Sequence, residues 1–477
     1  MQNLQQMRCS VVGMDNHRKK YYNISEKTGS DKIYALLDEV DSDLDDDLDN
    51  ELNDSDTEFV VEEDVDLRHE ATSNVSNILT PTANIHKASS SDKSTVCSAS
   101  KKETPEWKWS RTIKPSKKKE CKLQQNVLLQ FDGNPTPFDV YEKTLDLNKL
   151  LSDIVSQTNL YATQKGRNFV TNLAEMKAFL EMNSIMSINK LPTMEHYWST
   201  DRFIGNQALR DVMTKSRFKE ILQNVHFSNN DTADKVDKGN KVRPLINHFN
   251  EAFQTAMSNS SIQSIDEHMI KLKGRSSMKQ YIKSKPIKWG FKFWFRCDSR
   301  TGYLYDMDMY LGRKESTEYN LGESVVLHLA SGLDNSYCTL VFDNFFASPN
   351  LVQTLFDKNI YSMGTVRSNR KNMPKFSPDK SFTRGESEFK TSKNVVCVKW
   401  MDNRAVTMIG SNVGDSDHIS SVLRRQKGAS TKSPVSCPIL VKHYNHGMGG
   451  VDLCDQYTAA YHLDRRSKFR FLSENCF

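Results

Sequence analysis

The apolar residues change their spacing at Ser264, and this change divides the chain into a helical part and an α/β part. Between residues 128 and 260, apolar side chains recur at the three- and four-residue intervals of amphipathic helices. From Ser264 onward they alternate with a period of two, which is typical of strands. In the run KWGFKFWFR, one face of the strand would carry Phe291, Phe293 and Phe295. The sequence therefore predicts a helical domain followed by an α/β domain.

Three helices are predicted in the first part, each with an apolar stripe behind a capping residue. Asp146 is expected to cap the first helix and Ser216 the third. Asn172 and Glu175 are expected to form an asparagine-headed capping box for the second. The stripes are most simply core, so we place a helical domain at residues 123–260.

The second part shows the element order of a ribonuclease-H-like α/β core. Three strands that can pair antiparallel come first, and a helix, a strand, a helix and a strand follow. In order, these are SIDEHMIKL, KWGFKFWFR, YLYDMDMYLG, SVVLHLASGL, CTLVFDNFF, SPNLVQTLFDKN and MGTVR. Ser348 is expected to cap the second of the two helices.

Acidic residues stand at two strand positions of this core. Asp266 lies early in its first strand and Asp343 at the end of its fourth, and these strands are neighbours in such a fold. Asp452 and Asp455 lie three residues apart, on one face of a helix that Gly449-Gly450 could precede. Carboxylate oxygens suit Mg²⁺ or Mn²⁺, and two such ions about 3.5–4 Å apart would promote phosphoryl transfer. Because the chain has 60 acidic residues, spacing alone leaves a structural role open for each.

The net charge of +5 conceals an uneven distribution along the chain. Residues 1–66 hold 6 basic and 19 acidic residues, a net of −13, which leaves +18 for residues 67–477. Between Asp38 and Asp66, 16 of 29 residues are acidic, and such a block repels itself and cannot fold alone. The block is either a solubilising tail or an internal mimic of nucleic acid that competes for a basic surface.

A Ser/Thr/Asn-rich linker and a basic run follow the acidic block. We therefore place a disordered leader at residues 1–122. Within it, Lys117-Lys118-Lys119 is either a nuclear import signal or a solvated loop.

Other residue classes exclude several kinds of protein. The nine cysteines are widely spaced and include no CxxC pair, which argues against a disulfide framework or a structural zinc site. No stretch approaches the ~18 uninterrupted apolar residues of a membrane helix. Because no partner stands at metal-ligand spacing, we interpret His226 and His268 as structural.

Several segments together resemble the piggyBac-type DNA transposases and the host proteins derived from them. The resemblance covers about residues 128–470, in the family's order. Its most specific elements are DEHM at 266–269, FDNFF at 342–346, GTVRSNR at 364–370 and GGVDLCDQ at 449–456. The FDN triplet alone would carry no weight, whereas the combination is very specific.

The resemblance implies a set of functional residues and a domain order. Asp266, Asp343 and Asp452 would be the catalytic, metal-binding aspartates, holding two Mg²⁺ or Mn²⁺ ions, and Asp455 matches a nearby functional acid. The helical domain would serve dimerisation and DNA binding. A ribonuclease-H-like core at 261–370 and 441–477 would be interrupted by an inserted β-rich domain at 371–440, which contains a plausible hairpin, VVCVKW–RAVTMIG.

The implied activity is cut-and-paste transposition by a nuclear homodimer acting on double-stranded DNA. Water would nick the transposon end, the freed 3′-OH would form a hairpin on the opposite strand, and the opened end would join a TTAA target. The surplus of +18 fits a protein that follows phosphate backbones. The predicted phosphate contacts are Lys271, Lys273, Arg275, Lys283, Lys285, Lys288, Arg367 and Arg370. For some of these, a solvated strand edge remains the alternative.

The chain departs from the family pattern near its end. Family members continue past RRSK with a Trp-containing helix, and many add a cysteine-rich zinc domain, whereas this sequence ends at Phe477. We therefore expect no zinc, and we expect the segment that bears Asp452 to be the least stable part of the core. Two functions stay open: a transposase, and a domesticated or truncated DNA-binding protein without catalysis.

Overall fold

The computed structural model describes two separate units of the chain. The described residues are 10–15, 18–23, 107–201, 203–232, 234, 236–272, 274, 276–283, 285–312, 319–425 and 431–460. In the first unit, β1 (Ser10–Asp15) pairs antiparallel with β2 (Arg18–Asn23). The leader predicted to be disordered thus contains two strands, and its acidic block lies outside the described residues. The β-branched and aromatic residues of SVVGMD and RKKYYN favour strands, a local signal that our reasoning from charge missed.

The second unit begins with a group of helices that share one apolar core. They are α2 (Pro137–Thr144), α3 (Leu147–Gln164), α4 (Leu173–Ile188), α5 (Gln207–Val212), α6 (Lys215–Asn224) and α7 (Arg243–Ala256), with a 3₁₀ helix, η1, at Met194–Trp198. The core includes Leu151 and Ile154 of α3, Met186 of α4, and Phe218 and Ile221 of α6. The predicted apolar stripes are therefore buried, as their spacing indicated.

Within the helical domain, one of the three predicted capping residues caps its helix. The Asn172 side chain accepts a hydrogen bond from Glu175 N at 3.0 Å and caps α4, although no reciprocal bond from the Glu175 carboxylate to Asn172 N completes a box among the described residues. Asp146 precedes α3 with a φ of 44° and makes no side-chain capping bond. Ser216 lies inside α6, because Thr214 caps that helix by accepting from Arg217 N at 3.3 Å.

An ion pair links two of these helices and suggests a stability test. The Arg217 guanidinium donates to both carboxylate oxygens of Glu175, at 2.8 and 2.7 Å, and these hydrogen bonds lower the pKa of Glu175. Arg217→Met leaves that half-buried carboxylate without its cation, so we expect the free energy of unfolding to fall by about 1–2 kcal/mol in urea titrations. Lys219→Met, on the same helix, removes a more exposed pair with Glu195 and should cost less than about 0.5 kcal/mol. Equal losses would contradict this assignment.

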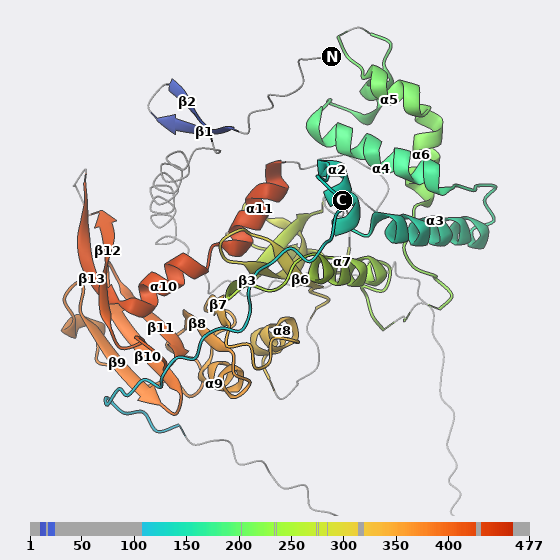
Figure 1. Ribbon diagram of the computed structural model, residues 1–477. Coiled ribbons are helices and arrows are strands. Elements are labelled where there is room, and N and C mark those ends of the chain that lie inside the picture. Colours follow the sequence, from blue (N-terminus) through green and yellow to red (C-terminus); the bar gives the residue numbers. More distant parts are fainter. Residues whose placement is uncertain are drawn as a thin grey trace, which may run out of the picture. The chain divides into compact units, whose positions relative to one another are not determined.

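A nine-stranded mixed sheet forms the rest of the second unit (Figure 1). Its order is β4-β5-β3-β7-β8-β11-β10-β9, and β6 pairs with β5 along the same edge as β4, away from β3. The first strands are β3 (Ile262–Lys271), β4 (Gln280–Tyr281), β5 (Trp289–Asp298), β6 (Leu304–Met309), β7 (Thr339–Phe342) and β8 (Tyr361–Thr365). With α8 (Leu321–Leu329) and α9 (Pro349–Asp357), they reproduce the predicted element order, apart from the two-residue β4, which was not predicted. Ser348 caps α9, as predicted, by accepting from Leu351 N at 3.1 Å.

Both faces of β5 are buried. Phe293, Phe295 and Cys297 pack with Ile246 of α7 and with Val451, which lies near the end of the described chain. On the opposite face, Trp294 joins a second cluster that includes Val326 of α8 and Leu351 of α9. The β strands at the centre of the sheet are therefore covered by helices on each side.

The region predicted as an inserted domain continues the same sheet instead of forming a separate body. It contains β9 (Ser387–Ser392), β10 (Val395–Met401) and β11 (Ala405–Ser411). β10 and β11 form the predicted hairpin, and β11 pairs antiparallel with β8, with Ile409 opposite Gly364. Within this region, β12 (Ile419–Arg425) and β13 (Lys432–Pro438) form a separate two-stranded sheet. The region is β-rich, as predicted, but its attachment to β8 could not be predicted, because strand pairing between distant segments leaves no mark in local alternation.

The predicted end of the leader at residue 122 was also wrong. Residues 107–122 lie extended along the sheet domain: Ser110 pairs with Thr391 and Ser116 with Val413. Trp109 Nε1 donates to the Asn372 carbonyl at 2.9 Å, and Trp107 stacks on Trp109 with centroids 5.6 Å apart. These aromatic side chains bury enough apolar surface to hold the segment, despite its basic charge. In the part of the chain that the structure describes, no helix is long and apolar enough to cross a membrane.

Candidate active site

Strand pairing brings two of the predicted aspartates together. β3 and β7 run parallel, with Ile265 opposite Phe342. The residues that come next, Asp266 in β3 and Asp343 directly after β7, therefore lie side by side. Asp343 follows the last residue of β7, where its Oδ1 accepts a hydrogen bond from Phe345 N at 2.9 Å and shapes the turn. The adjacency of these two residues confirms the predicted pairing of the first and fourth strands.

The third aspartate comes from a helix near the end of the described chain. α10 (Ile439–Gly447) leads from β13 into α11 (Gly450–Ala460), which carries Asp452 and Asp455 (Figure 1). α11 begins at a glycine because a Cβ at Gly450 would lie 2.5 Å from both the Asp298 carbonyl oxygen and Ser264 Oγ. This close approach packs the start of the helix against β3 and β5 and brings Asp452 to the charge cluster around Asp266.

Burial and the repulsion between neighbouring carboxylates raise the pKa values of the three aspartates. Burial, opposed by Lys285 and reinforced by Asp343, raises the pKa of Asp266 to about 8. Burial and the charge of Glu267 raise the pKa of Asp343 to about 6. Burial also raises the pKa of Asp452. A cation placed among these carboxylates would therefore be strongly favoured.

The structure brings further residues to the cluster that sequence reasoning missed. Lys292, buried on β5, pairs with Glu267 at 2.5 Å and lies over the Trp294 ring. Burial, followed by the charge of Asp343, raises the pKa of Tyr444 on α10. Glu267 adjoins Asp266 in the DEHM motif, and Tyr444 begins the run YNHGMGG, which leads into the GGVDLCDQ motif. The family motifs therefore pointed to the neighbourhood of both residues.

His268 and Asp455 contact each other, which the sequence did not predict. His268 Nδ1–H donates to the Asp455 carboxylate, and the His268 ring stacks on Phe295 with centroids 4.3 Å apart. The sequence showed no partner for His268 because the two residues are 187 positions apart. His226, in contrast, stacks on Tyr161 and bonds Asn230 within the helical core, which fits the structural role predicted for it.

The predicted phosphate contacts fall into different environments. Lys283 and Lys288 are exposed, Lys271 is half-buried, and Lys273 and Arg275 lie outside the described residues. Lys285 Nζ instead lies 3.7 Å from Asp266 Oδ2. Beyond β8, Arg367 Nε donates to Asn344 Oδ1 at 2.9 Å and Arg370 donates to the Asn344 carbonyl at 3.0 Å. The two arginines thus brace the turn that follows Asp343.

The carboxylates match a hard divalent cation in their chemistry. Asp266, Asp343 and Asp452 supply oxygen ligands of the kind that Mg²⁺ and Mn²⁺ prefer, and the Lys285 ammonium already stands among them as a positive charge. Within the described ranges, no three His, Cys, Asp or Glu side chains are arranged to hold a metal ion without movement. The donor set therefore fits the ion by its chemistry.

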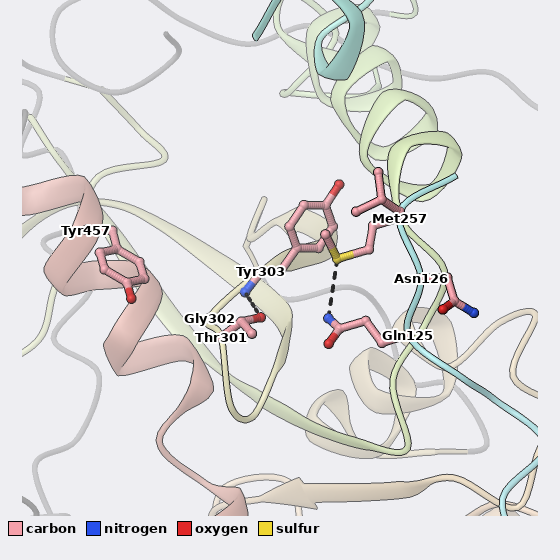
Figure 2. Close-up of a pocket in the computed structure, with 8 residues that line it drawn as sticks. Gln125, Asn126, Met257, Thr301, Gly302, Tyr303 and Tyr457 are labelled. Carbon is pink, nitrogen blue, oxygen red and sulfur yellow. Dashed lines mark hydrogen bonds between the residues drawn. The ribbon is translucent and has the colours of Figure 1, made fainter. Parts of the chain in front are cut away.

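A pocket of about 400 Å³ lies elsewhere on the second unit (Figure 2). Residues that line it include Gln125, Met257, Thr301, Gly302, Tyr303 and Tyr457. Gln125 Nε2 donates to Met257 Sδ at 3.3 Å and to Tyr305 Oη at 2.9 Å. None of the four aspartates lines the pocket, so we do not assign it to the acidic cluster.

Comparisons with known proteins place these features in a family. A protein-family profile described as Transposase IS4 matches residues 136–472. The chain is 32% identical over 345 residues to human PiggyBac transposable element-derived protein 3, covering 70% of this chain and 57% of that protein. It is 29% identical over 342 residues to human PiggyBac transposable element-derived protein 2, covering 69% and 57%. The chain therefore spans little more than half the length of these relatives.

A solved structure shares the fold. The chain is similar to a protein in the cryo-EM structure of the piggyBac transposase synaptic complex with hairpin DNA, with a TM-score of 0.58 and 24% sequence identity. The similarity covers 70% of this chain and 70% of that chain.

Proposed function

Because the chain belongs to the piggyBac family of transposases and transposase-derived proteins, we propose that it binds double-stranded DNA and catalyses metal-dependent phosphoryl transfer at transposon ends. The observation that carries this proposal is the buried pair Asp266 and Asp343 on neighbouring parallel strands, joined by Asp452 from α11. Burial and the neighbouring carboxylates raise their pKa values, so a divalent cation among them would be favoured. TTAA is the proposed target.

Each residue of the cluster has a distinct part in the proposed reaction. Asp266, Asp343 and Asp452 would hold the metal ions, which when bound activate the attacking oxygen and stabilise the leaving oxygen. His268 holds the Asp455 carboxylate and so fixes α11 against β3. Arg367 and Arg370 hold the turn after Asp343 and present positive charge beside it, where the DNA phosphate would lie.

The attacking group changes from step to step while the site stays the same. Water attacks phosphorus at the transposon end, and the 3′ oxygen leaves with a proton. That 3′-OH then attacks the opposite strand to form a hairpin. Opening of the hairpin by water and joining to the target are two further phosphoryl transfers. One arrangement of carboxylates can serve all of them because each has the same in-line geometry.

Other parts of the proposal rest on the fold. The order β6-β5-β3-β7-β8, with α8 and α9 in the connections, supports a ribonuclease-H-like core. The helical domain is the proposed site of homodimerisation and of part of the DNA contact. The exposed Lys117 and Lys118 support nuclear import, although Lys119 N is bound to Tyr361 Oη at 3.0 Å.

The test is nicking of an end-labelled duplex from the terminal repeat of the parent element. We expect cleavage with Mg²⁺ or Mn²⁺ and none with EDTA. Cleavage that persists in EDTA would contradict a metal-dependent site. Binding of the duplex without cleavage in any divalent metal would instead support the second candidate.

That second candidate is a DNA-binding protein of the same fold without catalysis. One observation favours it: the similar human proteins are named as derived from a transposable element. Terminal repeats beside TTAA around the gene would argue for the transposase.

The acidic block of the leader is expected to weaken DNA binding. Residues 1–66 carry −13 and the remainder +18, so the block competes with phosphate for the basic surface. A chain that starts at Trp107, which keeps the segment bound to the sheet, should bind duplex DNA more tightly than the full chain. The difference in DNA affinity between the two proteins should become smaller as added salt screens the charges.

A full-length variant with the block's Asp and Glu replaced by Asn and Gln is the matched control. It should bind like the shorter chain, since it lacks only the charges. Equal affinity of all three proteins at low salt would leave the block with a solubilising role alone.

A further inference from the structure

Lys285 is a basic residue whose charge faces inward. Its ammonium lies 3.7 Å from Asp266 Oδ2, and both side chains are largely buried, at 20% and 16% exposed. The nearby Lys288 is exposed. A lysine buried against a carboxylate cluster is held there by charge, so it does not serve as an ordinary surface contact for phosphate.

The environment of Lys285 is more negative than a single ion pair. Burial alone would lower its pKa, but the charges of Asp266, Glu267, Asp452 and Asp455 raise the pKa above its ordinary value. Lys285 is therefore fully charged at neutral pH and interacts with carboxylates from both β3 and α11.

The two members of the pair differ in how the backbone around them is held. Asp266 is held in β3, paired with Phe295 of β5 and beside β7. Lys285 lies in the loop between β4 and β5, so its side chain can withdraw without breaking a strand pair. A second cation at Asp266 would thus move the lysine and not the aspartate.

We propose that Lys285 is the resident counter-ion of the carboxylate cluster, and that a divalent metal ion binds Asp266 only by displacing the Lys285 ammonium. The inference rests on the proposed function, because it concerns the ion that the same carboxylates would hold. Metal–oxygen bonds of about 2.0–2.1 Å place the ion where it would repel a nearby ammonium. Lys285 is thus a positioning residue that keeps the cluster folded before the metal arrives.

The proposal predicts opposite effects on stability and on metal affinity. In EDTA, Lys285→Met should lower the Tm, because the carboxylates lose the ammonium that lies beside Asp266. With Mn²⁺ and no DNA, the same variant should bind the ion about tenfold more tightly, since no cation must be displaced. Mn²⁺ should therefore raise the Tm of Lys285→Met more than that of wild type. A residue with a purely structural role would lower the Tm without tightening metal binding.

Isothermal titration with Mn²⁺ alone is the decisive measurement. Lys285→Arg keeps the charge and should bind Mn²⁺ like wild type, as should the control Lys288→Met. Affinity in Lys285→Met no tighter than wild type, or an equal gain in Lys288→Met, would overturn the inference while leaving the proposed function intact. Absence of Mn²⁺ binding by wild type and Lys285→Met alike would reject the metal-dependent function, and the inference with it.

A second measurement needs no variant and so does not depend on folding of a mutant. The N-hydroxysuccinimide ester of acetic acid acetylates accessible lysine amines, and mass spectrometry measures the extent of acetylation at each lysine. Saturating Mn²⁺ should increase labelling of Lys285 several-fold in the wild-type chain, while the exposed Lys288 serves as the internal control. Unchanged labelling of Lys285 under conditions where Mn²⁺ is bound would overturn the displacement.

Discussion

Replacing Asp343 with asparagine is expected to reduce metal-dependent nicking about a thousandfold or more, equivalent to about 4 kcal/mol of transition-state stabilisation. The substitution is nearly isosteric. The asparagine Oδ1 can still accept from Phe345 N, so the turn after β7 should remain. What is lost is the negative charge beside Asp266 that would bind the metal ion.

The measurement is single-turnover nicking of transposon-end DNA in Mn²⁺, with duplex binding measured in parallel. Asp153→Asn is the matched control, since Asp153 is an exposed residue of α3. It should cleave like wild type. Cleavage by the Asp343 variant at the wild-type rate would show that the reaction occurs elsewhere on the protein.

The stability of the metal-free protein should depend on pH through the same residue. The pKa of Asp343 rises from 3.8 to about 6 in the folded state, because burial and the charge of Glu267 disfavour its ionised form. A raised carboxyl pKa leaves stability intact below about pH 4 and removes it as pH rises through about 6. The loss attributable to Asp343 is on the order of 3 kcal/mol by pH 8.

Urea unfolding in EDTA at about pH 4, 6 and 8 isolates this effect. Asp343→Asn should match wild type at the lowest pH and exceed its free energy of unfolding by about 3 kcal/mol at the highest. Asp153→Asn should show no such trend, and Mn²⁺ should remove much of the difference by neutralising the cluster. A difference between Asp343→Asn and wild type that is constant across this range would mean that Asp343 is not the titrating group. If the expected result is obtained, Asp343→Asn increases stability at neutral pH and abolishes function, which is a common pattern for buried catalytic groups.

Local patterns in the sequence predicted the individual elements well. The two-residue period identified β3, β5 and β6, and the helical period identified the buried stripes of the helical domain. The order of elements placed Asp266 beside Asp343, because neighbouring strands of such a core are set by connection rules. Family motifs identified Asp452, which no local pattern could single out among 60 acidic residues. The roles of these aspartates remain predictions.

The tertiary structure decided what depends on contact between distant segments. Trp107 reaches Asn350, 243 residues away, and so belongs to the sheet domain and not to the leader. The pairing of β11 with β8 joins a supposed insertion to the sheet. Lys285 is turned toward Asp266, although its surroundings in the sequence are those of an exposed basic loop. Periodicity reports which side of an element is apolar, whereas burial of charge depends on which elements meet, and only the folded chain sets that.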